Sequence, residues 1–369
     1  MREDILTTEL QKVSSESQRR ELYSMDWLDD KDKIIEGAFA ECYLKMHPMI
    51  CIHGILFTID GIVSDESGIK NDIYSMVRPY VTSGLARKVE QLLQTIKLEA
   101  YSEPLPLQTD RIRVANGTLF LNGEFSEQKD FCLNRLPVIY DLDVEKPARW
   151  LKFMEELLNP DDILTLQEYM GYMLLPTTKA QKMMLIIGKG GEGKSRIGLV
   201  LRELFGNNMY SCSLQKIEVD KFARANLEYM LITVDDDMKL EALPQTNHIK
   251  SIVTLEDQID LERKGQQSFQ GVVYARLIAF GNGGLHALYD KTDGFYRRQL
   301  ILTTKDKVDG REDDPYLIDK LRKERDGIFL WALEDYKDLF RIIMCLRRVW
   351  MPSRIWWMHR RREIISWHL

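Results

Sequence analysis

The first 147 residues alternate between charged stretches with helical spacing and short runs of β-branched residues. Residues 73–81 and 85–98 carry apolar side chains at every third or fourth position, which predicts two helices. Residues 52–63 and 112–125 are rich in β-branched and aromatic residues and contain Asp-Gly or Asn-Gly pairs, which predict short strands and tight turns. This mixture predicts a small α+β domain over residues 1–147.

From residue 148 the pattern changes to helices that alternate with almost wholly apolar strands. Asn159-Pro160 separates two predicted helices, because proline favours a helix start. Strands that alternate with helices predict a mostly parallel α/β sheet, and so a second domain over residues 148–340. The predicted elements are helices over 150–158, 163–175 and 327–340, strands over 183–187, 230–234, 275–280 and 296–302, and a hairpin of 259–261 with 269–273.

The loop after the first of these strands has the spacing G-x-x-x-x-G-K-S, with a helical pattern behind it. Glycines allow backbone N–H groups to curl around an oxyanion, and a helix N-terminus adds partial positive charge at the same point. A lysine in this position reaches the outer phosphates of a nucleotide, and the serine hydroxyl holds Mg²⁺. The predicted nucleotide-binding residues are Gly188, Lys189, Gly190, Gly191, Glu192, Gly193, Lys194 and Ser195.

Polar residues close two further strands of the predicted sheet. Asp235 and Asp236 follow the strand over 230–234, so we expect Asp235 to hold Mg²⁺ beside Ser195 and Asp236 to orient the attacking water. Asn282 ends the strand over 275–280, where a neutral amide suits a water near the terminal phosphate. The alternatives are a solvated acidic turn and an ordinary turn asparagine.

Two basic pairs are candidates for anion contacts. Arg263-Lys264 lies at the tip of the predicted hairpin, which suits the phosphate backbone of DNA. Arg297-Arg298 precedes the last strand, and an arginine there could act on the nucleotide of a neighbouring subunit. Each pair could instead belong to a solvated surface.

Composition limits the classes of function. The net charge is −6, but residues 341–369 hold seven Arg and one acid for a sum of +6, so the other 340 residues carry −12. DNA binding is therefore expected at local basic elements, not over the whole surface. Five dispersed cysteines predict reduced thiols and no zinc site, and no apolar run or N-terminal signal predicts a membrane span or export, so we expect a cytoplasmic protein.

Five segments in order carry a resemblance to a known family: GKGGEGKS, LITVDDD, DLERKGQQSF, ARLIAFGN and DGFYRR. Together they resemble the superfamily 3 helicase module of the phage and plasmid primase–helicase family, which includes poxvirus-type NTPases. The resemblance covers roughly residues 45–340. It implies an AAA+-like P-loop NTPase core preceded by a small α+β domain.

The resemblance also implies function. Members form hexameric rings that use ATP and Mg²⁺ to translocate on single-stranded DNA. The sequence has no polymerase-like acidic motif, so we expect no primer synthesis by this chain. A separate primase or replication initiator is therefore a further expected partner. By the same resemblance, Gly193, Lys194 and Ser195 are Walker A residues, Asp235 and Asp236 are Walker B, Lys264 lies in the B′ motif, Asn282 is the motif C residue, and Arg297 or Arg298 is the arginine finger.

Residues 341–369 differ in style from the rest, with four of the seven Trp and no Asp or Gly. Two explanations of this composition remain open: a frameshift near Phe340, or a genuine basic–aromatic element that binds DNA. Three other functions also remain: an initiator or loader ATPase without processive unwinding, a P-loop kinase of small molecules, and a decayed prophage fragment.

Overall fold

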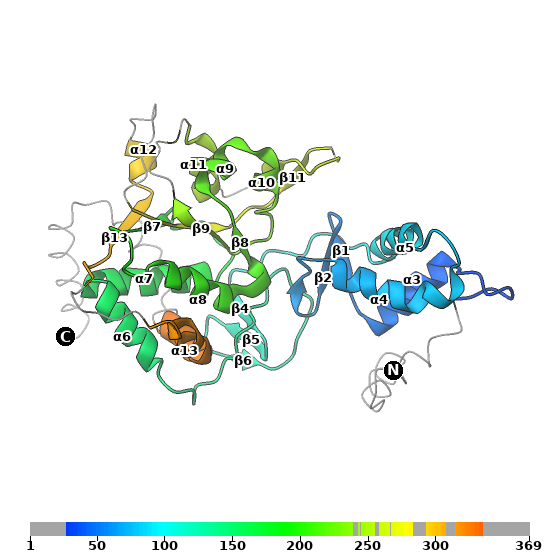
Figure 1. The fold of residues 1–369 in the computed structure, drawn as a ribbon, viewed down its shortest axis with the longest axis horizontal. Coiled ribbons are helices and arrows are strands. Elements are labelled where there is room, and N and C mark those ends of the chain that lie inside the picture. The colour runs from blue at the N-terminus through cyan, green and yellow to red at the C-terminus, as the bar shows by residue number, and fades with distance from the viewer. Residues whose placement is uncertain are drawn as a thin grey trace. The chain divides into compact units, whose positions relative to one another are not determined.

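The computed structural model of the chain describes residues 27–238, 243, 245–254, 258–265, 267–282, 293–307 and 314–334. Two compact units divide near Pro106. The first holds the residues up to Pro106 together with Asp130–Leu133, and the second holds Leu107–Lys129 and the residues from Asn134 onward (Figure 1). The Arg/Trp-rich tail over 341–369 lies outside the described residues.

The first unit combines helices with a three-stranded antiparallel sheet in the order β1-β2-β3. Its core includes Trp27, Phe39 and Leu92, all almost fully buried. The β1–β2 turn consists of His53 and Gly54, both with positive φ, which matches the twist that a two-residue hairpin needs. The elements are α3 (Glu36–Met46), β1 (Ile50–Ile52), β2 (Ile55–Thr58), β3 (Gly61–Ile62), α4 (Ser67–Val77), a 3₁₀ turn (Arg78–Tyr80) and α5 (Leu85–Glu99).

A five-stranded parallel sheet forms the centre of the second unit, in the order β13-β7-β12-β9-β8. The predicted parallel α/β sheet is therefore confirmed. The strand that precedes the glycine loop, β7, is apolar throughout because both faces of the sheet are covered. The strands are β7 (Met183–Ile187), β8 (Met209–Ser211), β9 (Ile232–Met238), β12 (Arg276–Gly281) and β13 (Gln299–Thr303).

Helices cover both faces of this sheet (Figure 1). On one face, Ile197, Val200 and Leu204 from the apolar stripe of α8 pack on even-numbered residues of β7. The opposite face is covered by α9, α11, α12 and the hairpin β10–β11. The helices and the hairpin are α6 (Ala148–Leu157), α7 (Pro160–Met173), α8 (Ser195–Phe205), a 3₁₀ turn (Gly206–Asn208), α9 (Leu214–Val219), α10 (Lys221–Ala225), α11 (Asn247–Thr254), β10 (Ile259–Leu261), β11 (Phe269–Gly271), α12 (Asp293–Tyr296), α13 (Leu317–Lys323) and α14 (Arg325–Leu333).

A second small sheet, β4 (Arg111–Val114), β5 (Gly117–Phe120) and β6 (Phe125–Ser126), also belongs to this unit. Ile112 and Leu119 are buried in the same core as α6 and α8. The compact second unit thus begins earlier in the chain than residue 148, the start expected from the change in sequence pattern. No helix of the described part of the chain is long and apolar enough to span a bilayer.

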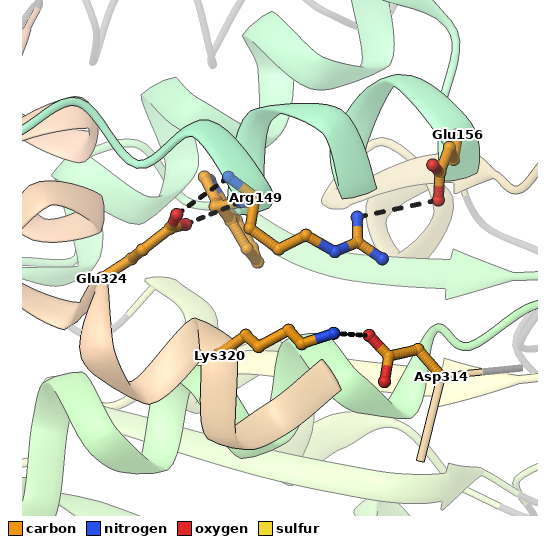
Figure 2. Close-up of polar contacts among 6 residues, drawn as sticks. Arg149, Glu156, Asp314, Lys320 and Glu324 are labelled. Carbon is orange, nitrogen blue, oxygen red and sulfur yellow. Dashed lines mark hydrogen bonds and ion pairs between the residues drawn. The ribbon is translucent and has the colours of Figure 1, made fainter. Parts of the chain in front are cut away.

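A carboxylate joins α6 to the start of α14, and a shorter-range ion pair lies nearby on α13 (Figure 2). Glu324, which precedes α14, accepts hydrogen bonds from the backbone N–H groups of Arg149 and Trp150 at 2.9 and 2.8 Å. These are among the first N–H groups of α6, which lack partners within the helix, and a carboxylate also suits the positive end of the helix dipole. On α13, Lys320 pairs with Asp314 at 2.7 Å.

Candidate functional site

The loop between β7 and α8 has a backbone that only glycines adopt readily. Gly190, Gly191 and Gly193 have φ values of +107°, +83° and +100°. At Gly188 the restriction is one of space, because an added Cβ would lie 2.2 Å from the Thr304 hydroxyl and 3.0 Å from the Glu192 carboxyl group. The four glycines of the predicted motif therefore each have a structural reason.

Lys194 and Asn282, which lie 88 positions apart in sequence, meet at the carboxyl edge of the sheet. The Lys194 ammonium donates a hydrogen bond to Asn282 Oδ1 at 2.9 Å. Lys194 immediately precedes α8, and Asn282 immediately follows β12, whose residue Gly281 pairs with Ile187 of β7. Ser195 is the first residue of α8 and is exposed. The structure thus brings Lys194, Ser195 and Asn282 to one place.

Glu192 fills the inside of the loop. Its Oε1 accepts hydrogen bonds from the backbone N–H groups of Lys189 and Gly190 at 2.5 and 2.7 Å, and its Oε2 lies 3.3 Å from Lys194 Nζ. Glu192 is only 2% exposed. Burial raises the pKa of this carboxyl group, but the backbone hydrogen bonds and Lys194 outweigh burial and hold the pKa below its ordinary value.

Asp235 and Asp236 point to opposite faces of the sheet. The strand predicted to close at Val234 continues to Met238, so both acids lie within β9 and their side chains alternate. Asp236 is exposed on the α8 face, where its Oδ1 would lie 3.4 Å from a Cβ added at Gly198. Asp235 is buried on the other face and accepts a hydrogen bond from the backbone N–H of Leu214 at 2.9 Å. Burial raises the pKa of the Asp235 carboxyl group.

The predicted basic hairpin is present, but its two basic residues differ. Arg263 forms an ion pair with Glu228, whose side chain is fully buried, and its guanidinium lies 4.8 Å from the centre of the Phe269 ring. Lys264 is exposed at the tip, next to Gly265 with φ +76°. Lys264 is therefore presented to solvent, whereas Arg263 ties the loop of the hairpin to the buried Glu228.

Arg297 and Arg298 lie at the other end of the sheet from the glycine loop. They precede Gln299, which pairs with Met183 at the start of β7, whereas the loop follows the end of β7. Five strand residues at about 3.3 Å each separate the two ends by about 16 Å. Arg298 is half-buried and its guanidinium donates to the carbonyl of Gly294, whereas the Arg297 side chain is exposed.

Two residues near these groups escaped the sequence interpretation. Asp306 forms an ion pair with Lys189 of the loop at 2.8 Å, and it follows β13 at the same edge as Asn282. The sequence signal that could have identified Asp306 is its position as a polar residue just after a predicted strand. Lys182 donates to the carbonyl of Arg297 at 2.5 Å, and burial, followed by the nearby Arg297 and Arg298, lowers its pKa to about 8.

Comparison with known proteins supports the fold. The profile of DUF5906, described as a family of unknown function, matches residues 186–298. The A-form apo structure of the NrS-1 C-terminal region is 10% identical, with a TM-score of 0.54 over 83% of this chain and 70% of that chain. Another apo structure of this region gives the same values. At this identity the similarity establishes a shared fold only.

A JCV helicase with a bound small molecule is a more distant match. It is 16% identical, with a TM-score of 0.30 over 60% of this chain and 58% of that chain. A TM-score this low supports no argument about the present chain.

The two basic residues of the hairpin should differ in their effect on stability. Arg263→Ala leaves the Glu228 carboxylate buried without its cation, which should lower the free energy of unfolding by about 3–5 kcal/mol. Lys264→Ala, one position away and exposed, should change it by less than about 0.5 kcal/mol. Urea unfolding of both variants measures the difference, and equal stabilities would contradict the assigned role of Arg263.

Proposed function

We propose that the chain is an ATP-driven DNA helicase motor of the superfamily 3 type, with ATP bound by the loop over residues 188–195. The proposal covers a cytoplasmic phage- or plasmid-encoded protein that acts as a hexameric ring on single-stranded DNA during replication. The fold shared with the NrS-1 C-terminal region is compatible with the NTPase core that the sequence resemblance implies.

One observation carries the proposal: the hydrogen bond between Lys194 and Asn282. A lysine at the start of a helix, behind glycines with positive φ, suits the outer phosphates of a nucleotide. An amide from the neighbouring strand beside that lysine suits a water molecule at the terminal phosphate without adding charge there. A small-molecule kinase is instead expected to carry a lid and an acceptor site in place of Asn282 and the Arg297-Arg298 pair.

The opposite orientations of the two aspartates favour roles that differ from the expected ones. Ser195 begins α8, and Asp236 is the acid on the α8 face. We therefore assign the Mg²⁺ contact to Ser195 and Asp236, whereas the sequence assigned it to Asp235. Bound there, Mg²⁺ would neutralise phosphate charge. Asp235 then orients the start of α9 through the Leu214 N–H.

The remaining basic residues take roles set by their position. Lys264 contacts the DNA backbone from the exposed hairpin tip. Arg297 lies too far from the loop of its own chain to reach that nucleotide, so it acts on the nucleotide of a neighbouring subunit. Arg298 supports this turn through Gly294 and does not itself serve as the finger.

The function is tested by ATP hydrolysis with and without single-stranded DNA. We expect DNA to stimulate hydrolysis, and Lys194→Ala to reduce the rate at least about a hundredfold, because the phosphates lose their cation. Lys264→Ala should keep the DNA-independent rate and lose the stimulation. A wild-type rate that does not respond to DNA would favour a kinase or another P-loop enzyme.

The assignment of the two aspartates is tested by their amide variants. Asp236→Asn should raise the Mg²⁺ concentration needed for half-maximal hydrolysis by at least about tenfold, because a metal ligand is weakened. Asp235→Asn retains an oxygen that can accept from Leu214 and should leave the Mg²⁺ requirement within about twofold of wild type. Magnesium titrations at fixed ATP distinguish the two, and the reverse order would restore the assignment made from sequence.

The position of Arg297 predicts complementation between subunits. Arg297→Ala alone should hydrolyse little ATP but still bind it, and Lys194→Ala alone should be inactive. In a mixture, some interfaces combine an intact loop with an intact Arg297, so activity should return in part. Hydrolysis and mass by light scattering are measured at several mixing ratios. A mixture that assembles but stays inactive at every ratio would contradict a shared site.

A further inference from the structure

The carboxylate of Glu192 lies where a bound anion would satisfy the loop. Its two oxygens contact two backbone N–H groups of the glycine loop and the Lys194 ammonium, which are the same kinds of donor that a phosphate group uses. With 2% exposure it is shielded from water, so these contacts are not weakened by solvent. A solvated surface acid would have neither property.

We propose that Glu192 is an internal substitute for phosphate, which occupies the loop in the nucleotide-free protein and must give up Lys194 when a nucleotide binds. The inference rests on the proposed nucleotide site and adds a group that lowers the affinity of this site for nucleotide. Lys194 has two partners, Glu192 at 3.3 Å and Asn282 at 2.9 Å. A polyphosphate needs the same ammonium and carries charge of the same sign as Glu192. The carboxylate therefore competes with the ligand.

Glu192 also has a reason to stay in the loop until a ligand arrives. The Lys189 and Gly190 N–H groups would otherwise be left without an acceptor, which is costly for partly buried donors. The pKa of the carboxyl group lies below its ordinary value, so the group is charged at neutral pH. The loop is thus held in shape by its own anion, at the expense of nucleotide affinity.

The test is the affinity for ATP of variants that remove the charge but keep an acceptor. Glu192→Gln retains an amide oxygen for the two N–H groups but no longer attracts Lys194. We expect its Kd for Mg-ATP, measured by isothermal titration calorimetry, to fall about tenfold, which corresponds to about 1.4 kcal/mol. Tripolyphosphate alone should show the same gain, because the competition concerns the phosphates and not the base. Glu192→Asn is a second neutral variant for which a gain is also expected.

Asp306→Asn is the matched control. Asp306 pairs with Lys189 of the same loop, but both side chains are largely exposed, and the change also removes one negative charge. If the effect is specific to the buried carboxylate, this variant should bind ATP within about twofold of wild type. A gain equal to that of Glu192→Gln would overturn the proposal in favour of a general charge effect.

The outcomes separate the two proposals. If wild type binds ATP and the neutral Glu192 variants bind it equally or more weakly, the competition is overturned and the nucleotide site stands. If neither neutral variant folds, as judged by thermal unfolding, Glu192 is an indispensable part of the loop and not a displaceable anion. If wild type and all variants fold but bind neither ATP nor tripolyphosphate, the nucleotide site fails, and the role of Glu192 fails with it.

Discussion

The parallel pairing of β7 with β12, and of β12 with β9, is the constraint on which the candidate site depends. Parallel strands end at the same edge of a sheet, so the groups that follow them meet although they are far apart in sequence. Gly281 pairs with Ile187, which places Asn282 beside the loop that carries Lys194. A shift of this register by one residue would turn the side chains of β12 to the other face and remove the contact.

The same sheet decides which charges can act on one ligand. Because side chains alternate along β9, the two adjacent aspartates have different environments. Asp236 lies on the α8 face and is exposed, whereas Asp235 is buried and accepts a hydrogen bond from Leu214. A buried carboxylate that already accepts a backbone N–H is costly to move. The electrostatics of the loop follow the same principle, since Glu192 remains charged inside the protein only because N–H groups and Lys194 surround it.

Much of this arrangement could be predicted from the sequence, because the informative patterns are local. Apolar runs predicted β7 and β12, and the glycine spacing predicted the loop. The edge strand β8 was not predicted, since none of its three residues is fully buried and they form no apolar run. The extension of β9 through Asp237 to Met238 was also missed, because acids normally end strands and the pairing of Met238 with Gly281 that extends this one is a tertiary contact.

Roles that depend on tertiary contacts could not be predicted from the sequence. Arg263 and Lys264 are adjacent basic residues at a turn, and nothing local distinguishes them; the buried Glu228, 35 positions earlier, does so. Arg297 and Arg298 differ in the same way through Gly294. In each pair the side chain of one residue forms a contact within the fold, and the side chain of the other is exposed.

The two ends of β7 have consequences for how such a motor would couple its subunits. The loop lies at one end and the turn with Arg297 at the other, and Lys182, at the start of the strand, donates to the Arg297 carbonyl. A fully apolar strand packed on both faces is rigid, so a displacement of the loop can be transmitted along β7 to this turn. In the proposed ring, the turn of one subunit would face the nucleotide of the next. A rigid strand between the two groups would then link occupancy of one site to the position of the arginine at its neighbour.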